Sequence, residues 1–206
     1  GTVFNWTNNN TTIGLAASGT GNIASFTATN ATNAPVVATI VVTPGYTNAG
    51  VTCVGSSKTF TITVNPTPMV NAVANQTVCA GTVVTATFSG PVAGTVYNWT
   101  NSNTAIGLGA SGTGNLSFTA TNATAAPISG TITVTPTYTN GGTSCSGTPV
   151  TFTITVNPTP QVNQPANQIV CAGSPTAPVN FTGPVAGTIY NWTNNNTSIG
   201  LAAGGT

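Results

Sequence analysis

The ten residues TFTITVNPTP at positions 151–160 carry the clearest structural signal in the chain. Phe152, Ile154 and Val156 alternate with threonines, and strict alternation of apolar and polar β-formers is typical of a strand with one buried face. Two prolines follow, which cannot donate ladder hydrogen bonds and which hold the backbone extended. The stretch therefore predicts a strand that ends a domain, followed by a short, stiff linker.

The same ten residues occur at positions 59–68, so the chain is built from repeats. A second motif, an aromatic residue followed by Asn-Trp-Thr, recurs every 93 residues and begins at Phe4, Tyr97 and Tyr190. A period near 92 residues is too long for one turn of a solenoid and has the length of a small domain. We therefore expect the C-terminal part of a first repeat at residues 1–66, a complete repeat at 67–158, and the N-terminal part of a third at 159–206.

Further strand signals fall within one period, at residues 82–88, 95–99, 116–121 and 130–139. Asn-Gly-Gly at 140–142 is a turn signal, so we expect a hairpin that joins residues 130–139 to residues 151–156 across a loop containing Cys145. No stretch has the composition of a helix. Short strands separated by Gly, Pro and Asn predict an all-β fold of tandem immunoglobulin-like sandwiches joined by short proline-rich linkers.

The repeated tryptophan is expected to be structural, because an immunoglobulin-like sandwich packs a tryptophan of its third strand between the sheets. Trp99 should then be almost wholly buried, with Tyr97 on the same face. The predicted core residues are Trp6, Trp99, Trp192, Tyr97 and Phe152. A tryptophan that stacks on carbohydrate is the alternative. The Gly-rich run after Trp99 lacks the helix and the lysine of a phosphate-binding loop.

The charge composition excludes most chemistry. The 206 residues include one basic residue, Lys58, no acidic residue and no histidine, so the groups that usually perform acid–base catalysis and bind metal ions are missing. We expect no enzyme, no cofactor and no metal. A net charge of +1 does not suit nucleic acid, and no apolar run reaches the roughly 18 residues of a membrane span. Because residue 1 falls inside a repeat, we expect a piece of a longer chain.

The order of these motifs resembles a known family. NQTVCAG, an alternating strand, YNWT, SGTGN, TVTPTYTNGGTSCSG and FTITVNPTP follow one another as in the PKD-like repeats of large Bacteroidota cell-surface proteins. These include gliding-motility adhesins exported by the type IX secretion system. The resemblance covers the whole chain and implies an immunoglobulin-like sandwich of about seven strands, without catalytic residues, that acts as a spacer or an adhesive stalk.

Four cysteines, spaced 92 residues apart in two pairs, suggest disulfides in an extracellular protein. The repeat leaves two regular pairings open. Either Cys79 bonds Cys145 within one repeat, leaving Cys53 and Cys171 for neighbouring repeats, or Cys53 bonds Cys79 and Cys145 bonds Cys171 across the linkers. A proline-rich linker suits the first pairing better than a returning hairpin, and the family resemblance also points to it. Four free, buried cysteines are the third interpretation.

Asn-x-Ser/Thr sequons offer candidate glycosylation sites at Asn5, Asn30, Asn75, Asn98, Asn122, Asn180 and Asn191. A chain this rich in Asn and Thr also produces sequons by chance. Glycans would keep a nearly uncharged surface soluble, whereas such a surface otherwise favours association.

The expected function is that of a structural repeat segment, the stalk or filament shaft of an adhesin, located outside the cell or on its surface. Its partners would be other repeats of the same chain. The alternatives are a self-assembling extracellular filament, in which other copies are the partners, and a glycan-binding adhesin module that recognises surface glycans through its Asn-rich loops. Ice binding through threonine rows such as Thr59, Thr61 and Thr63 is weaker, because threonine is an ordinary exposed strand residue.

Overall fold

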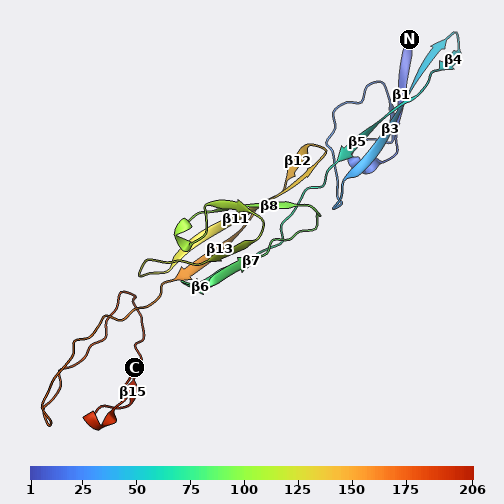
Figure 1. The fold of residues 1–206 in the computed structure, drawn as a ribbon. Coiled ribbons are helices and arrows are strands. Elements are labelled where there is room, and N and C mark those ends of the chain that lie inside the picture. The colour runs from blue at the N-terminus through green and yellow to red at the C-terminus, as the bar shows by residue number, and fades with distance from the viewer.

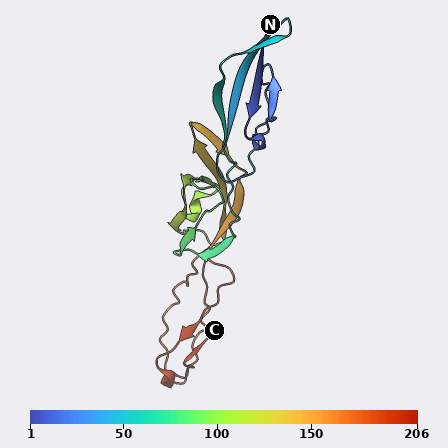
Figure 2. The same cartoon turned by 90° about the vertical axis from the view of Figure 1, so that its right-hand side faces the viewer.

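The computed structural model describes residues 1–206, and its strands form three groups that follow one another along a single line (Figures 1 and 2). Strands β1 to β5 fall within residues 1–66, β6 to β13 within residues 67–158, and β14 and β15 within residues 159–206. These are the ranges expected from the sequence for the first, second and third repeats, and the three groups are named accordingly below. Helical structure is limited to three single turns of 3-10 helix. No helix is long and apolar enough to cross a membrane.

The second repeat is a β-sandwich. Its strands are β6 (Gln76–Cys79), β7 (Val83–Ala86), β8 (Val96–Asn101), β9 (Ser111–Thr113), β10 (Leu116–Thr119), β11 (Ile128–Asn140), β12 (Thr143–Ser146) and β13 (Val150–Asn157). One sheet has the order β6-β13-β11-β8-β9, and a two-stranded sheet of β10 and β7 forms the other layer. All pairs are antiparallel except β13 with β6, which is parallel. The predicted all-β sandwich is confirmed.

The hairpin predicted across a loop at Cys145 differs in one respect. Strand β11 is 13 residues long and pairs along its first half with β13 and along its second half with β12. Cys145 therefore lies in a strand, opposite Tyr138, and not in a loop. The turn signal at Asn-Gly-Gly closes the tight β11–β12 hairpin, where Gly141 and Gly142 both have positive φ.

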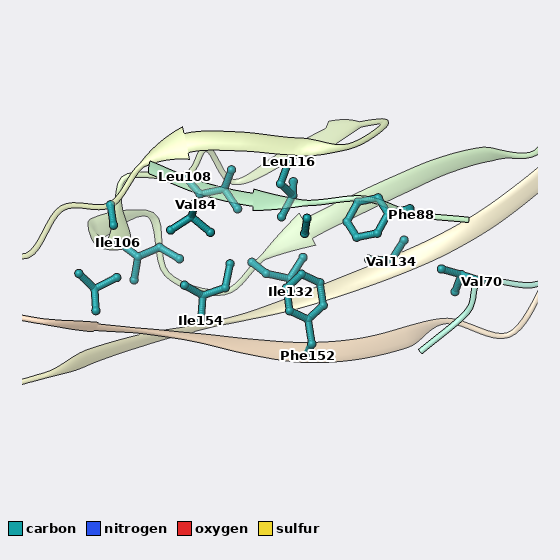
Figure 3. Close-up of a cluster of buried hydrophobic side chains, with 13 residues drawn as sticks. Val70, Val84, Phe88, Ile106, Leu108, Leu116, Ile132, Val134, Phe152 and Ile154 are labelled. Atoms are coloured by element: carbon teal, nitrogen blue, oxygen red, sulfur yellow. The ribbon is translucent and has the colours of Figure 1, made fainter. Parts of the chain in front are cut away.

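The core of the second repeat lies between its two layers (Figure 3). Phe152, Ile154 and Val156 are at most 2% exposed, as their alternation with threonines predicts. Ile132 and Val134 extend the same face on β11, and the opposite layer contributes Val84, Ala86 and Leu116. Burial of this continuous apolar layer supplies the main stabilising free energy of the repeat.

The first repeat contains the matching sheet, formed by β1 (Thr2–Asn8), β2 (Ser18–Thr20), β3 (Val36–Asn48), β4 (Val51–Val54) and β5 (Lys58–Val64). Its core cluster is smaller and centres on Trp6, Ile13 and Ile40. Phe60 is 45% exposed, whereas its counterpart Phe152, covered by Phe88 of the second layer, is 2% exposed. The third group has only β14 (Trp192–Thr193) and β15 (Gly204–Gly205).

Candidate functional site

The tryptophan of each repeat packs against a glycine of the neighbouring strand. Trp99 on β8 is opposite Val134 of β11 and Gly112 of β9. A Cβ atom at Gly112 would overlap Cζ2 of the indole and lie 2.8 Å from Cε2. Trp6 makes the same contact with Gly19. The small residue therefore lets the ring lie flat along the edge of the sheet.

The exposure of the three tryptophans differs. Trp6 is 8% exposed, while Trp99 and Trp192 are half-buried. Trp99 packs against the core cluster of the second repeat from one edge, so the expectation that it is almost wholly buried between the sheets is too strong. The indole N–H groups of Trp6 and Trp99 are buried and have no hydrogen-bond partner.

The other two predicted core residues meet around Phe88. Its ring centroid lies 6.1 Å from that of Tyr97 and 6.2 Å from that of Phe152. Tyr97 is half-buried and Phe152 is buried. Burial raises the pKa of the Tyr97 hydroxyl above its ordinary value of 10.0, because the phenolate is less well solvated there.

The asparagines after the tryptophan hold their own loop together. Nδ2 of Asn101 donates to the carbonyl oxygens of Asn103, Leu108 and Gly109 at 3.0, 2.9 and 3.3 Å, and its Oδ1 accepts from the Asn103 N–H at 3.1 Å. Asn101 is only 9% exposed. Such side-chain bonds satisfy backbone groups that no strand partner reaches.

Asn103 performs a second task in the same loop. Its Oδ1 accepts from the Ala105 N–H and so caps the 3-10 helix at Thr104–Ile106, while its Nδ2 donates to Ser129 on β11. The first repeat repeats this scheme with Asn8 and Asn10. The sequence interpretation missed this role. The Asn-x-Asn spacing before a threonine, which favours Asx turns, could have indicated it.

The linker between the first and second repeats is packed, not free. Pro66 and Pro68 are fully buried. Gly147 lies so close to the Pro68 carbonyl that a Cβ atom there would overlap its oxygen. Pro68, one of the two prolines predicted to stiffen the linker, is therefore packed against the second repeat.

The tip of the β11–β12 hairpin binds the end of the first repeat. Nδ2 of Asn140 donates to Oδ1 of Asn65 at 2.9 Å, and Nδ2 of Asn65 donates to the carbonyl oxygens of Asn140 and Thr143 at 3.2 and 3.4 Å. Figure 2 shows the gold hairpin reaching the first repeat. Successive repeats are therefore joined by the linker and by this hairpin.

The predicted disulfide between Cys79 and Cys145 is wrong. All four cysteines are free. Cys79 lies opposite Asn157, near the start of β11, while Cys145 lies opposite Tyr138, ten residues further along that strand. At about 3.3 Å per residue the two positions are roughly 33 Å apart, whereas a disulfide needs Cα atoms within about 7 Å.

The alternative pairing of Cys53 with Cys79 across the linker fails for the same reason. Cys53 lies opposite Tyr46, at the end of β3 that is remote from the linker. Cys79 lies at the far end of the second repeat. The sequence repeat predicts the spacing between the cysteines. It does not predict at which end of the sandwich each cysteine lies.

The sequon asparagines have different environments. Nδ2 of Asn122 donates to the carbonyl oxygens of Ala126 and Val156, both at 2.8 Å, and Asn30 makes the equivalent two bonds. Attachment of a glycan at either nitrogen would break one of them. Asn75 accepts a hydrogen bond from the Thr153 N–H. The exposed sequon asparagines with no such internal bond to the backbone are Asn5, Asn98, Asn180 and Asn191.

No group of three or more His, Cys, Asp or Glu side chains lies together. Two open depressions lie along the third repeat and at its junction with the second. The prominent features are thus the packing of the tryptophan loop and the contact between repeats. A comparison with curated proteins gives no match. Residues 76–160, which hold every strand of the second repeat, match the PKD-like domain family.

Proposed function

We propose that this chain is a segment of the shaft of a long extracellular protein, a stalk that holds an adhesive part away from the cell surface. A PKD-like domain suggests an extracellular structural or adhesive repeat module, and such domains are generally non-catalytic. The stalk role and the location at the cell surface go beyond what the family match shows. The expected response of the repeat to tension along the chain supports them.

The observation that supports a stalk most strongly is the parallel pairing of the first and last strands. Residues 76–79 of β6 pair with residues 154–157 of β13. The chain enters the repeat ahead of β6 and leaves it after β13, so tension pulls these two strands in opposite directions along their axes. The hydrogen bonds between them are then sheared together and are not opened one after another.

The junction supports the same role. Its buried prolines and the Asn65–Asn140 bonds keep successive repeats in line, which lengthens the molecule without extra residues. Other repeats of the same chain are thus the proposed partners.

The two alternatives have separate support. A surface with one charged side chain favours association, as a self-assembling filament would need. A glycan-binding module would need free amides in its Asn-rich loops. The amide of Asn101 is already bonded within the loop and that of Asn103 to the Ser129 carbonyl on β11, which disfavours a glycan-binding role.

Single-molecule force spectroscopy tests the stalk. Pulled from its two ends, the second repeat should unfold in one step that releases roughly 300 Å of chain, at about 3.6 Å per residue. Val78→Pro, within β6, should lower the unfolding force because proline disrupts the sheared pair. The matched variant Val83→Pro lies in β7, which pairs only with β10, and should change the force much less.

Equal unfolding forces in the two variants would refute the shear role of β6 and β13. Sedimentation velocity across a dilution series separates the stalk from the filament, because a stalk stays monomeric at every concentration. A glycan array tests the binding module in the same preparation.

A further inference from the structure

We propose that, where complete repeats follow one another, Cys79 of one repeat forms a disulfide with the β12 cysteine of the next, the counterpart of Cys145. With a period of 92 residues, this pairing joins positions 158 residues apart in sequence, which is about 1.7 repeats. It differs from both pairings that the sequence alone suggested.

The contact between the first and second repeats shows how the β11–β12 hairpin of one repeat lies against the end of the repeat before it. There the tip of the β11–β12 hairpin, Asn140 to Thr143, is hydrogen-bonded to Asn65 at the end of the preceding repeat (Figure 1). Cys145 is two residues beyond Thr143 on the same strand, so its side chain lies on the same face, about 6.6 Å further along.

The other cysteine, Cys79, lies at the boundary between the second and third repeats. Asn157 is the counterpart of Asn65, because both follow the identical strand TFTITV. Cys79 is the direct strand partner of Asn157, and the Ala80 N–H donates to the Asn157 carbonyl at 3.0 Å. Neighbouring strands are about 4.8 Å apart. Cys79 therefore flanks the position that a following hairpin binds.

An open hollow marks that position. Its volume is about 540 Å³, and its lining includes Pro127, Asn157, Pro158, Val185 and Ile189. In the first junction the corresponding asparagine is bonded to the hairpin tip. The hollow is thus where the β11–β12 hairpin of a complete third repeat would lie, with its cysteine beside Cys79.

The arrangement also accounts for four free thiols. Within residues 1–206, Cys79 and Cys171 each lack a following β12 hairpin, and Cys53 and Cys145 each lack a preceding first strand. Cys79 is exposed and Cys145 half-buried, so both can react. A disulfide reagent such as oxidised glutathione would be the oxidant. Two protein thiols lose two electrons and two protons as their S–S bond forms, and the glutathione S–S bond is reduced to two thiols.

The test uses the full chain extended after Thr206 by a copy of residues 114–160, which completes the third repeat because Thr206 corresponds to Thr113. The chain is equilibrated with oxidised and reduced glutathione, alkylated and mapped by mass spectrometry. Cys79 and the added cysteine should be linked and protected, while Cys53, Cys145 and Cys171 are alkylated. In the unextended chain all four should be alkylated.

Two variants of the extended chain complete the test. Cys79→Ser should leave the added cysteine fully alkylated, whereas the matched Cys171→Ser should leave the bond intact. Alkylation of Cys79 in an extended chain whose circular dichroism shows a folded third repeat would overturn the proposal. So would a bond found only between separate molecules on a non-reducing gel.

A variant of the original chain covers the case in which the added segment does not fold. Asn65→Cys with Asn140→Cys places two thiols where the side chains are now hydrogen-bonded. They should oxidise within one molecule, whereas Asn157→Cys with Asn140→Cys, at opposite ends of the second repeat, should not. Failure of the first pair to link would show that the hairpin is not bound to the preceding repeat, and the proposal would fall.

Discussion

Substitution of Gly112 by alanine should destabilise the second repeat by forcing the indole of Trp99 out of place. The new Cβ atom would overlap Cζ2 and lie 2.8 and 3.0 Å from Cε2 and Cη2. These distances are well inside normal carbon–carbon contact, about 3.5–4.0 Å. Forcing an extra methyl group into a packed core costs about 1–3 kcal/mol, and full loss of a tryptophan contact costs about 3–5 kcal/mol.

We therefore expect a loss of about 2 kcal/mol. At about 4–8 °C per kcal/mol for a domain of this size, the melting temperature should fall by about 8–16 °C. Urea and thermal unfolding followed by circular dichroism measure both quantities. Gly109→Ala is the matched control, because a Cβ atom there meets nothing closer than 3.9 Å, and it should change stability by less than about 0.5 kcal/mol.

A double-mutant cycle makes the test specific. Trp99→Leu alone is destabilising, but it removes the ring atoms that the new methyl group would overlap, so Gly112→Ala should cost much less in that background. An undiminished cost in the Trp99→Leu chain would refute the contact as the cause. Equal stability of the Gly112→Ala and Gly109→Ala chains would refute the packing itself.

Four further outcomes are expected. Asn101→Ala should lower the free energy of unfolding by about 2–4 kcal/mol, because it removes four hydrogen bonds worth about 0.5–1.5 kcal/mol each. Substitution of the exposed Asn98 by alanine, the control, should lower it by less than about 1 kcal/mol. Equal losses for the two variants in urea titrations would contradict the role of Asn101. Gly147→Ala should displace Pro68 and loosen the junction between the first and second repeats. Small-angle X-ray scattering should then show a broader distribution of molecular lengths, while each repeat keeps its melting temperature. An unchanged scattering curve would argue against a packed linker. The melting temperature should stay flat between pH 4 and pH 7, because the chain has no carboxylate side chain or histidine. Above about pH 10 the free energy of unfolding should fall, because the pKa of Tyr97 is raised in the folded state. The unfolded chain then loses the Tyr97 proton at a lower pH than the folded chain, so rising pH favours unfolding. Tyr97→Phe should reduce this alkaline loss of stability, and an undiminished loss in that variant would contradict the role of Tyr97.

The sequence by itself determined the repeat and the alternating strands, but not β12, which it placed in a loop. The alternation of Phe152, Ile154 and Val156 with threonines specifies which face is buried, because the side-chain period of a strand is two whatever it pairs with. Spacing of identical motifs gave the period, and the composition shows that the acidic residues and histidines most often used in acid–base and metal chemistry are missing. These properties are local or compositional, so they require no knowledge of distant contacts.

Tertiary structure alone decided where the cysteines lie and how the repeats meet. Cys79 and Cys145 belong to one repeat, yet the length of β11 places them at opposite ends of it. The parallel pairing of β6 with β13 and the bond from Asn140 to Asn65 join residues about 75 to 80 positions apart. Such contacts depend on how the sheets twist and pack, and no local pattern of residues encodes that. The same holds for the glycine beneath Trp99, because only the register of β8 with β9 brings Gly112 under the indole ring.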